Sequence, residues 1–170
     1  MKRPFFQFSH ESPYHISVGA VLVDEEGKIA CHYFAEKVEN EDIYILMRES
    51  VEDGESILTT LTRGLLEEFG AKADPIAFLG SLVGRVPSEN LVFEKTTLYL
   101  LCFLRKWDIN LRFPNDPESD STIEWLSPEE LIFRMRAQRK YGRIDLDESE
   151  IIERAQEYLQ KNSSCCEPFL

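Results

Sequence analysis

One helix is sharply outlined by residues 56–70, and this helix constrains the fold more than any other segment. Ser56 suits the N-cap position, because its hydroxyl can accept a hydrogen bond from a backbone N–H of the first helical turn. Gly70 suits the position at which the helix ends. Between them, apolar residues recur at helical spacing and predict a core-facing stripe of Leu58, Leu61, Leu65 and Phe69.

Short apolar segments separated by turn residues predict strands on both sides of this helix. Before it, they cover residues 15–23, 28–34 and 43–47, with a hairpin turn at 24–27 and a polar loop at 48–55. After it, they cover 76–83, 93–104 and 122–126, with a Pro-rich loop at 107–121. Further helices are expected from residue 127 onward and over 147–160. The pattern predicts an α/β (α+β) fold with a mixed sheet between helices.

The length and charge of the chain limit its organisation and its partners. At 170 residues it can bury a core without disulfides or metals as staples. We expect an N-terminal arm at 1–13, one domain at 14–160 and a flexible tail at 161–170. With 31 acidic and 19 basic side chains, the net charge of −12 argues against a general nucleic-acid binder.

Apolar runs and cysteines indicate the expected cellular location of such a chain. No run approaches the roughly 20 apolar residues that span a bilayer, and no apolar signal-peptide segment follows Met1. Cys31 and Cys102 lie in apolar strand-like runs, which predicts buried thiols. We therefore expect a cytoplasmic protein without a membrane partner.

Two adjacent carboxylates near the end of the helix are the main candidates for chemistry. Glu67 and Glu68 offer the hard oxygen ligands that Mg²⁺ or Mn²⁺ prefers. They diverge by about 100° around the helix, so they could hold different ions or bracket a single one. Arg63 lies four residues before Glu67, and this pair could equally be an ordinary ion pair on a solvated face. His15 and His32 show no ligand spacing and are expected to be structural or exposed.

The combined spacing of these residues resembles the signature of the Nudix hydrolases, enzymes that cleave diphosphates attached to another moiety. That signature runs Gly, five residues, Glu, seven residues, Arg-Glu-apolar-any-Glu-Glu-any-Gly-apolar. Its matching positions are occupied here by Glu55, Arg63, Leu65, Glu67, Glu68 and Gly70. The segment at 124–131 is similar to a strand-to-helix segment found late in many members. The resemblance covers residues 14–135 and implies an α/β/α sandwich.

The chain departs from this signature at two positions. Glu49 stands where the family has its first glycine, and Gly64 stands where it has the first glutamate of the helix. A glycine inside a helix costs about 1 kcal/mol relative to alanine, so Gly64 could serve the close approach of a neighbouring strand or loop. If the family geometry is retained, Gly64→Glu is expected to raise activity.

The resemblance implies a metal-dependent hydrolase of a small-molecule diphosphate, namely a nucleoside diphosphate linked to another moiety. Glu67 and Glu68 would hold Mg²⁺ or Mn²⁺, and Arg63 would orient these carboxylates. Glu55 would be a partner of Arg63 or a water-mediated ligand. Arg48 and Arg85 are further candidates for contact with substrate.

The general base and the activity itself are left open by the missing carboxylate at position 64. Candidate bases outside the helix are Glu89, Glu94, Asp116, Glu118 and Asp120, of which Glu94 is preferred because it heads a long apolar strand. The alternatives to an enzyme are a catalytically silent Nudix-fold module that binds a ligand or a protein, and an unrelated α/β protein. The aromatic residues Phe5, Phe6 and Phe8 of the arm could support a homodimer.

Overall fold

The computed structural model of this chain describes residues 7 and 9 and the ranges 14–38, 40–88, 91–141 and 146–163. Most of the expected N-terminal arm lies outside these residues, including Phe5, Phe6 and Phe8. Glu89 and most of the expected tail also lie outside them.

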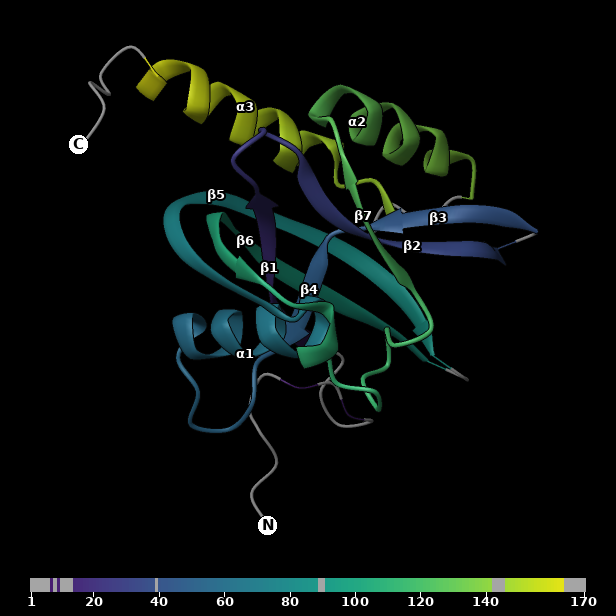
Figure 1. The fold of residues 1–170 in the computed structure, drawn as a ribbon. Helices are drawn as coiled ribbons and strands as arrows, with labels where there is room; N and C mark the ends of the chain where they lie inside the picture. Colours follow the sequence, from purple (N-terminus) through teal and green to yellow (C-terminus); the bar gives the residue numbers. More distant parts are fainter. Residues whose placement is uncertain are drawn as a thin grey trace.

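A mixed sheet forms the middle layer of the fold (Figure 1). Its path is β3-β2-β1-β6-β5, with β4 paired to β1 and β7 paired to β2. β1 and β6 run parallel, whereas the other pairs are antiparallel. The strands are β1 (Tyr14–Val23), β2 (Ile29–Val38), β3 (Glu41–Ile45), β4 (Met47–Ser50), β5 (Ala71–Ser88), β6 (Leu91–Trp107) and β7 (Thr122–Leu126).

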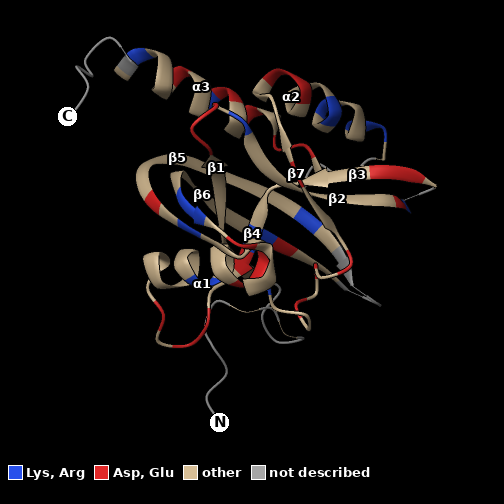
Figure 2. Ribbon diagram, in the orientation of Figure 1, with Lys and Arg blue, Asp and Glu red and all other residues tan. Residues whose placement is uncertain are grey.

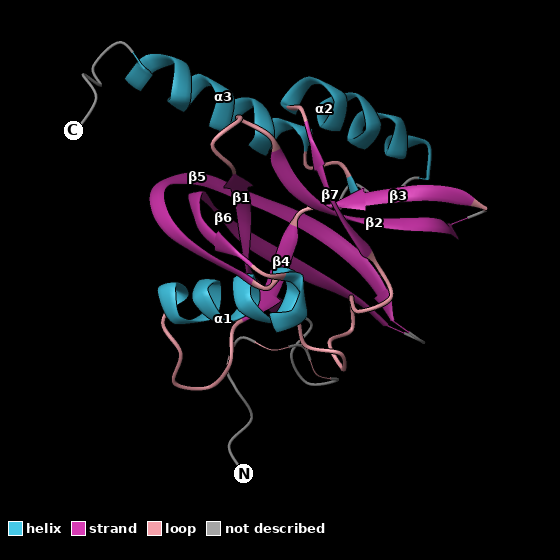
Figure 3. Cartoon of the chain, in the orientation of Figure 1, coloured by secondary structure: helices cyan, strands magenta, loops and turns pink. Residues whose placement is uncertain are grey.

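Helices lie on both sides of this sheet, as Figure 3 shows. α1 (Ile57–Phe69) lies on one side, and α2 (Pro128–Ala137) and α3 (Ser149–Ser163) lie together on the other. Short 3₁₀ turns at Ile109–Leu111 and Gln138–Tyr141 connect these elements. The expected mixed sheet between helices is therefore confirmed.

The central strand β1 shows why the chain folds into these layers. Alternate side chains of a strand point to opposite faces of a sheet. Val21 and Val23 accordingly belong to the core under α2 and α3, whereas Ala20 and Leu22 belong to the core under α1. Both faces of β1 are covered, which is why its sequence reads as a nearly continuous apolar run.

The structure corrects the expected polar loop before α1. Residues 47–50 form β4, which pairs antiparallel with β1 from Ala20↔Met47 to Ser17↔Ser50. Its three polar side chains are half-buried, because they line a cavity rather than the core. Polar residues in a short strand carry no period-two apolar signal, so the sequence pattern predicted a loop.

The burial of Leu58 and the start of β5 also differ from the prediction. Leu58 is 53% exposed, because the core contact of α1 begins one turn later at Leu61. β5 begins at Ala71 rather than at residue 76, and its register shifts between Pro75 and Ala77. Proline is tolerated at such an irregularity because it has no N–H to donate to the ladder.

Cys31 and Cys102 are buried free thiols, as predicted. Within the described ranges, no helix is both long enough and apolar enough to span a bilayer.

Candidate functional site

A cavity of about 350 Å³ lies beside the C-terminal half of α1. Its walls come from α1, β4, β6 and the loop that follows the first 3₁₀ turn. In Figure 2 the acidic residues of α1 are gathered at its end, next to β4. The charged residues that line the cavity are Arg48, Glu49, Glu52, Arg63, Glu67, Glu68, Lys95, Asp116 and Glu118.

Arg63 is the centre of an ion-pair network in this cavity. Its Nε and Nη2 donate to the two carboxylate oxygens of Glu55, each at 2.8 Å. Nη2 also donates to the Ser50 carbonyl at 2.8 Å. Nη1 lies 3.1 Å from a Glu49 oxygen and 3.3 Å from a Glu67 oxygen. The hydrogen bonds from Arg63 lower the pKa of Glu55 to about 2, so Glu55 is an ionised anchor for the guanidinium.

Three carboxylates approach one another closely at the mouth of this network. Glu49, Glu67 and Asp116 each place one oxygen within 4.8 Å of the others. They come from β4, α1 and the loop, and the loop is held on α1 because Phe113 N donates to the Glu67 carbonyl at 2.9 Å. Several carboxylate oxygens around one point are the ligand set that Mg²⁺ or Mn²⁺ prefers.

Glu68 lies behind these carboxylates and is only 2% exposed, although it lines the same cavity. Its Oε2 accepts hydrogen bonds from His32 Nε2 at 2.7 Å and from the Arg48 amide at 3.4 Å. No partner for Oε1 is found among the described residues. Burial raises the pKa of Glu68 well above its usual value, and the nearby Glu118 carboxylate adds to the effect.

A chain of hydrogen bonds holds Glu68 from the side opposite the cavity. Arg112 Nη2 donates to Ser121 Oγ at 2.7 Å, and Ser121 Oγ lies 2.8 Å from His32 Nδ1. Burial lowers the pKa of His32 well below its usual value, which favours the neutral imidazole. In the tautomer protonated at Nε2, Ser121 would donate to Nδ1 and His32 would donate to Glu68, and this would fix the orientation of the carboxylate.

This relay was missed by sequence reasoning, which expected His32 to be structural or exposed, whereas it is fully buried beside Glu68. Its members lie at positions 32, 68, 112 and 121, with no shared local motif. A histidine in an apolar strand was the one available signal. Its partners become visible only when β2, α1 and the loop after the 3₁₀ turn are brought together.

Gly64 allows a very close contact between α1 and β4. A Cβ atom built at position 64 would lie 2.5 Å from the Cβ of Glu49 and 2.9 Å from the sulfur of Met47. Real Cβ atoms essentially never approach other atoms so closely. The interpretation of Gly64 as a close-approach residue is therefore supported, whereas the expected benefit of Gly64→Glu alone conflicts with this geometry.

Two of the predicted site residues do not reach this cavity. Glu94 and Arg85 are cross-strand partners on β6 and β5, and they line a separate hollow with Tyr14, Val92 and Phe93. The structure therefore does not bring Glu94 or Arg85 together with the carboxylates of α1.

The cation Lys95, and not Glu94, is the β6 residue on the cavity wall, because successive side chains of a strand point to opposite faces. Burial lowers the pKa of Lys95 to about 8, and the positive charge of Arg48 adds to the shift. Lys95 and Arg48, together with Arg63, place positive charge among the carboxylates of the cavity.

Of the other candidate bases, Asp116 and Glu118 line the cavity. Burial raises the pKa of Glu118 to about 7, and its hydrogen bond with Asp116 contributes. Asp120 is exposed and forms an ion pair with Lys37 at 2.7 Å.

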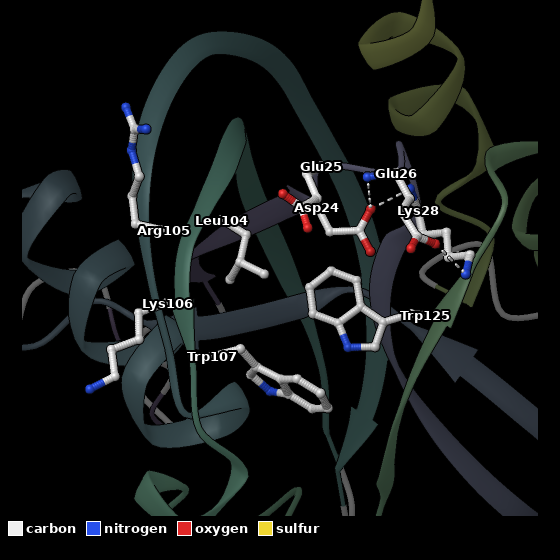
Figure 4. Close-up of a pocket in the computed structure, with 9 residues that line it drawn as sticks. All are labelled: Asp24, Glu25, Glu26, Lys28, Leu104, Arg105, Lys106, Trp107 and Trp125. Carbon is white, nitrogen blue, oxygen red and sulfur yellow. Dashed lines mark hydrogen bonds and ion pairs between the residues drawn. The ribbon is translucent and has the colours of Figure 1, made fainter.

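A second hollow, of about 460 Å³, lies between the β1–β2 turn and the end of β6 (Figure 4). Trp107 and Trp125 meet edge to face in it at 5.6 Å between ring centroids. Lys28 and Glu26 form an ion pair at 2.8 Å there, and a carboxylate oxygen of Asp24 accepts hydrogen bonds from the amides of both residues. Among the described residues, the group of carboxylates that could hold a metal ion lies in the α1 cavity and not in this second hollow.

Comparisons with solved structures identify proteins of the same fold. The chain has the fold of a NUDIX hydrolase from Nitrosomonas europaea, with a TM-score of 0.59 and 14% identity over 91% of this chain and 96% of that one. It also resembles the crystal structure of a MutT protein from Methanosarcina mazei Go1, with a TM-score of 0.53 and 18% identity over 91% and 99% of the two chains. Among curated proteins, none matches the sequence.

The family itself follows from the sequence. The model of the NUDIX domain matches residues 13–146, a range that includes α1, β4 and every charged residue of the cavity. The strand-to-helix segment at 124–131 also lies within this match. The chain therefore belongs to the NUDIX domain family.

Proposed function

We propose that this protein is a divalent-metal-dependent hydrolase that cleaves the diphosphate of a nucleoside diphosphate linked to another moiety. One observation carries the proposal: three carboxylate oxygens from different elements lie within 4.8 Å of one another beside the buried Glu68. Such a group of like charges is unfavourable unless a cation or protons compensate it.

The donors in the cavity fit Mg²⁺ or Mn²⁺. Glu67 is in the carboxylate cluster, and Glu68 presents an oxygen without a hydrogen-bond partner among the described residues. These two glutamates would hold the ion, as the family signature implies. Once bound, the ion would neutralise charge on the diphosphate oxygens and acidify the attacking water.

The cations of the cavity have separate roles in this proposal. Arg63 holds the carboxylates in place through Glu55, Glu49 and Glu67. Arg48 and Lys95 would bind the substrate phosphates, since both line the cavity. Arg85 is no longer a candidate for this contact, because it lies in another hollow.

Glu118 replaces Glu94 as the proposed general base. It lines the cavity beside Asp116, so a water molecule between this loop and α1 would be within its reach. Its carboxylate would accept the proton as the water attacks phosphorus. Glu94 lines a different hollow and is therefore not placed to share that water.

The test is turnover of a panel of nucleoside diphosphate derivatives with Mg²⁺ or Mn²⁺, for the wild type and for Glu68→Gln. We expect the wild type to release a nucleoside monophosphate or a phosphate ester. We expect Glu68→Gln to lose at least about 100-fold in kcat/KM, because a ligand charge is removed with little change in shape.

Glu26→Gln is the matched control, because Glu26 lies in the tryptophan-lined hollow and should not affect turnover. Absence of turnover across the panel, from a folded protein that still binds a nucleotide, would contradict the proposal. It would support the catalytically silent module instead.

A further inference from the structure

We propose that Glu49 supplies the carboxylate that Gly64 lacks, so that a glutamate and a glycine have exchanged places between β4 and α1. The inference rests on the proposed metal-dependent function, because it assigns Glu49 to the ligands of that ion. On this view the two departures from the family signature, Glu49 and Gly64, are linked: the carboxylate lost from position 64 is replaced by the one at position 49.

The packing of α1 on β4 is the first argument for this exchange. A Cβ at position 64 would lie 2.5 Å from the Cβ and 3.1 Å from the Cγ of Glu49. The side chain of Glu49 therefore begins at almost the same point in space as a side chain at position 64 would begin. Without a shift of α1 or β4, only one of the two positions can carry a side chain.

The direction of the Glu49 carboxylate is the second argument. Its oxygen lies within 4.8 Å of the ligand oxygens of Glu67 and Asp116. Position 64 lies one turn before Glu67 on the same face of α1, so a glutamate there would face the same cluster. The amide of Ser50 donates to Glu49 Oε1 at 2.7 Å, and Arg63 Nη1 lies 3.1 Å from the same oxygen. These two contacts hold the carboxylate in this direction.

The neighbouring Glu68 gives independent reason to expect a cation at this point. It is 98% shielded from solvent and lines the same cavity, and no partner of its Oε1 is found in the described part of the chain. Its carboxylate therefore keeps acceptor capacity on the wall of the cavity, which a cation held there by Glu49 and Glu67 would use. The cluster is thus more than a group of acids on a solvated face.

The test measures Mn²⁺ binding without substrate, by the loss of the electron paramagnetic resonance signal of free Mn²⁺. The variants are Glu49→Gln and the exchange variant that combines Glu49→Gly with Gly64→Glu. We expect Glu49→Gln to weaken Mn²⁺ binding at least about tenfold. The exchange variant should bind Mn²⁺ within about threefold of the wild type, because it returns the same carboxylate from the helix side.

Glu52→Gln is the matched control. Glu52 also lines the cavity and lies 3.9 Å from Arg63, but it is outside the three-carboxylate cluster. Its substitution should leave Mn²⁺ affinity within about twofold. A purely structural role of Glu49, as a partner of Arg63, would lower the melting temperature of Glu49→Gln without changing its Mn²⁺ affinity.

The outcomes separate this inference from the proposed function. Unchanged Mn²⁺ binding by Glu49→Gln, together with loss of binding in Glu68→Gln, would overturn the exchange and leave the metal-dependent hydrolase standing. Absence of Mn²⁺ binding by the wild type would overturn both. If the exchange variant does not fold, Glu49→Gln still decides, because glutamine keeps the shape of the side chain.

Discussion

Two buried glutamates, Glu68 on α1 and Glu148 just before α3, have very different surroundings. Glu148 is fully buried, and its two oxygens accept hydrogen bonds from the Tyr99 hydroxyl and, at 2.7 Å, from the Leu46 amide. Arg48 Nε lies 3.8 Å from it. Burial raises the pKa of both carboxyls, but the neighbouring charge with the largest effect on Glu148 is the cation Arg48, whereas for Glu68 it is the anion Glu118.

This difference indicates how a structural carboxylate can be told from a functional one. Both oxygens of Glu148 are occupied by protein donors, so the side chain ties β6 and the β3–β4 junction to the start of α3. Glu68 is held by one of its oxygens and faces the acids of the cavity. Burial alone does not distinguish the two residues, whereas the use of each oxygen does.

The largest expected effect is on stability, from Glu148→Ala. This variant leaves the buried Tyr99 hydroxyl and Leu46 amide without their acceptor, so we expect the free energy of unfolding to fall by about 3–5 kcal/mol. Urea unfolding followed by circular dichroism measures this change. Glu68→Gln is the comparison: its amide oxygen can still accept both hydrogen bonds, so it should lose at most about 1 kcal/mol. Equal losses would break the distinction between the two residues.

The next effect is stabilisation by metal. Mg²⁺ or Mn²⁺ at about 100 times its dissociation constant should add about 2.7 kcal/mol to the free energy of unfolding, or about 5–10 °C to the melting temperature. Differential scanning fluorimetry measures this shift. It should be lost in Glu68→Gln and retained in Glu148→Gln, each compared with its own metal-free baseline. A shift that depends on Glu148 instead would reverse the roles assigned to the two glutamates.

The smallest effect concerns the close contact between α1 and β4 next to these acids, through Gly64→Ala. Alone, this change should cost about 1–3 kcal/mol, because the new Cβ would meet the Cβ of Glu49. In a Glu49→Gly background the cost of the same change should be smaller by about 1–2 kcal/mol, because only the sulfur of Met47, 2.9 Å from the new Cβ, then has to shift. Chemical denaturation of the four proteins of this double-mutant cycle gives the coupling. Additive effects would mean that α1 and β4 are not in contact at these positions.

Local sequence signals predicted the elements whose formation depends on nearby residues. Ser56 caps α1 through a hydrogen bond to the Thr59 amide, and Gly70 ends the helix with φ +65°, as their positions indicated. Arg63 pairs with Glu67 one turn later, as expected for this spacing. The close approach at Gly64 was also anticipated, because an interior helical glycine requires a structural reason.

The site was only partly predictable, because its members come from different elements. Glu94 was preferred over the loop acids for its place at the head of a strand, but the face to which a strand residue points depends on how the sheet is covered. Lys95 had no local feature that marked it, and His32 was marked only as a histidine in an apolar strand. Asp116 and Glu118 lie in a Pro-rich loop whose path depends on the hydrogen bond from Phe113 to the end of α1.

The sequence by itself determined the family, the capped helix with its carboxylates and the layered fold, because caps, periodicity and spacing act over a few residues. Only the tertiary structure decided that Glu49 meets Gly64 and that Glu68 is held by His32. These contacts join residues 15 and 36 positions apart on different elements, so they depend on how β4 and β2 pack against α1. The spacing of residues along the chain does not show that these pairs are in contact. Their contact depends on how the helix packs on the sheet.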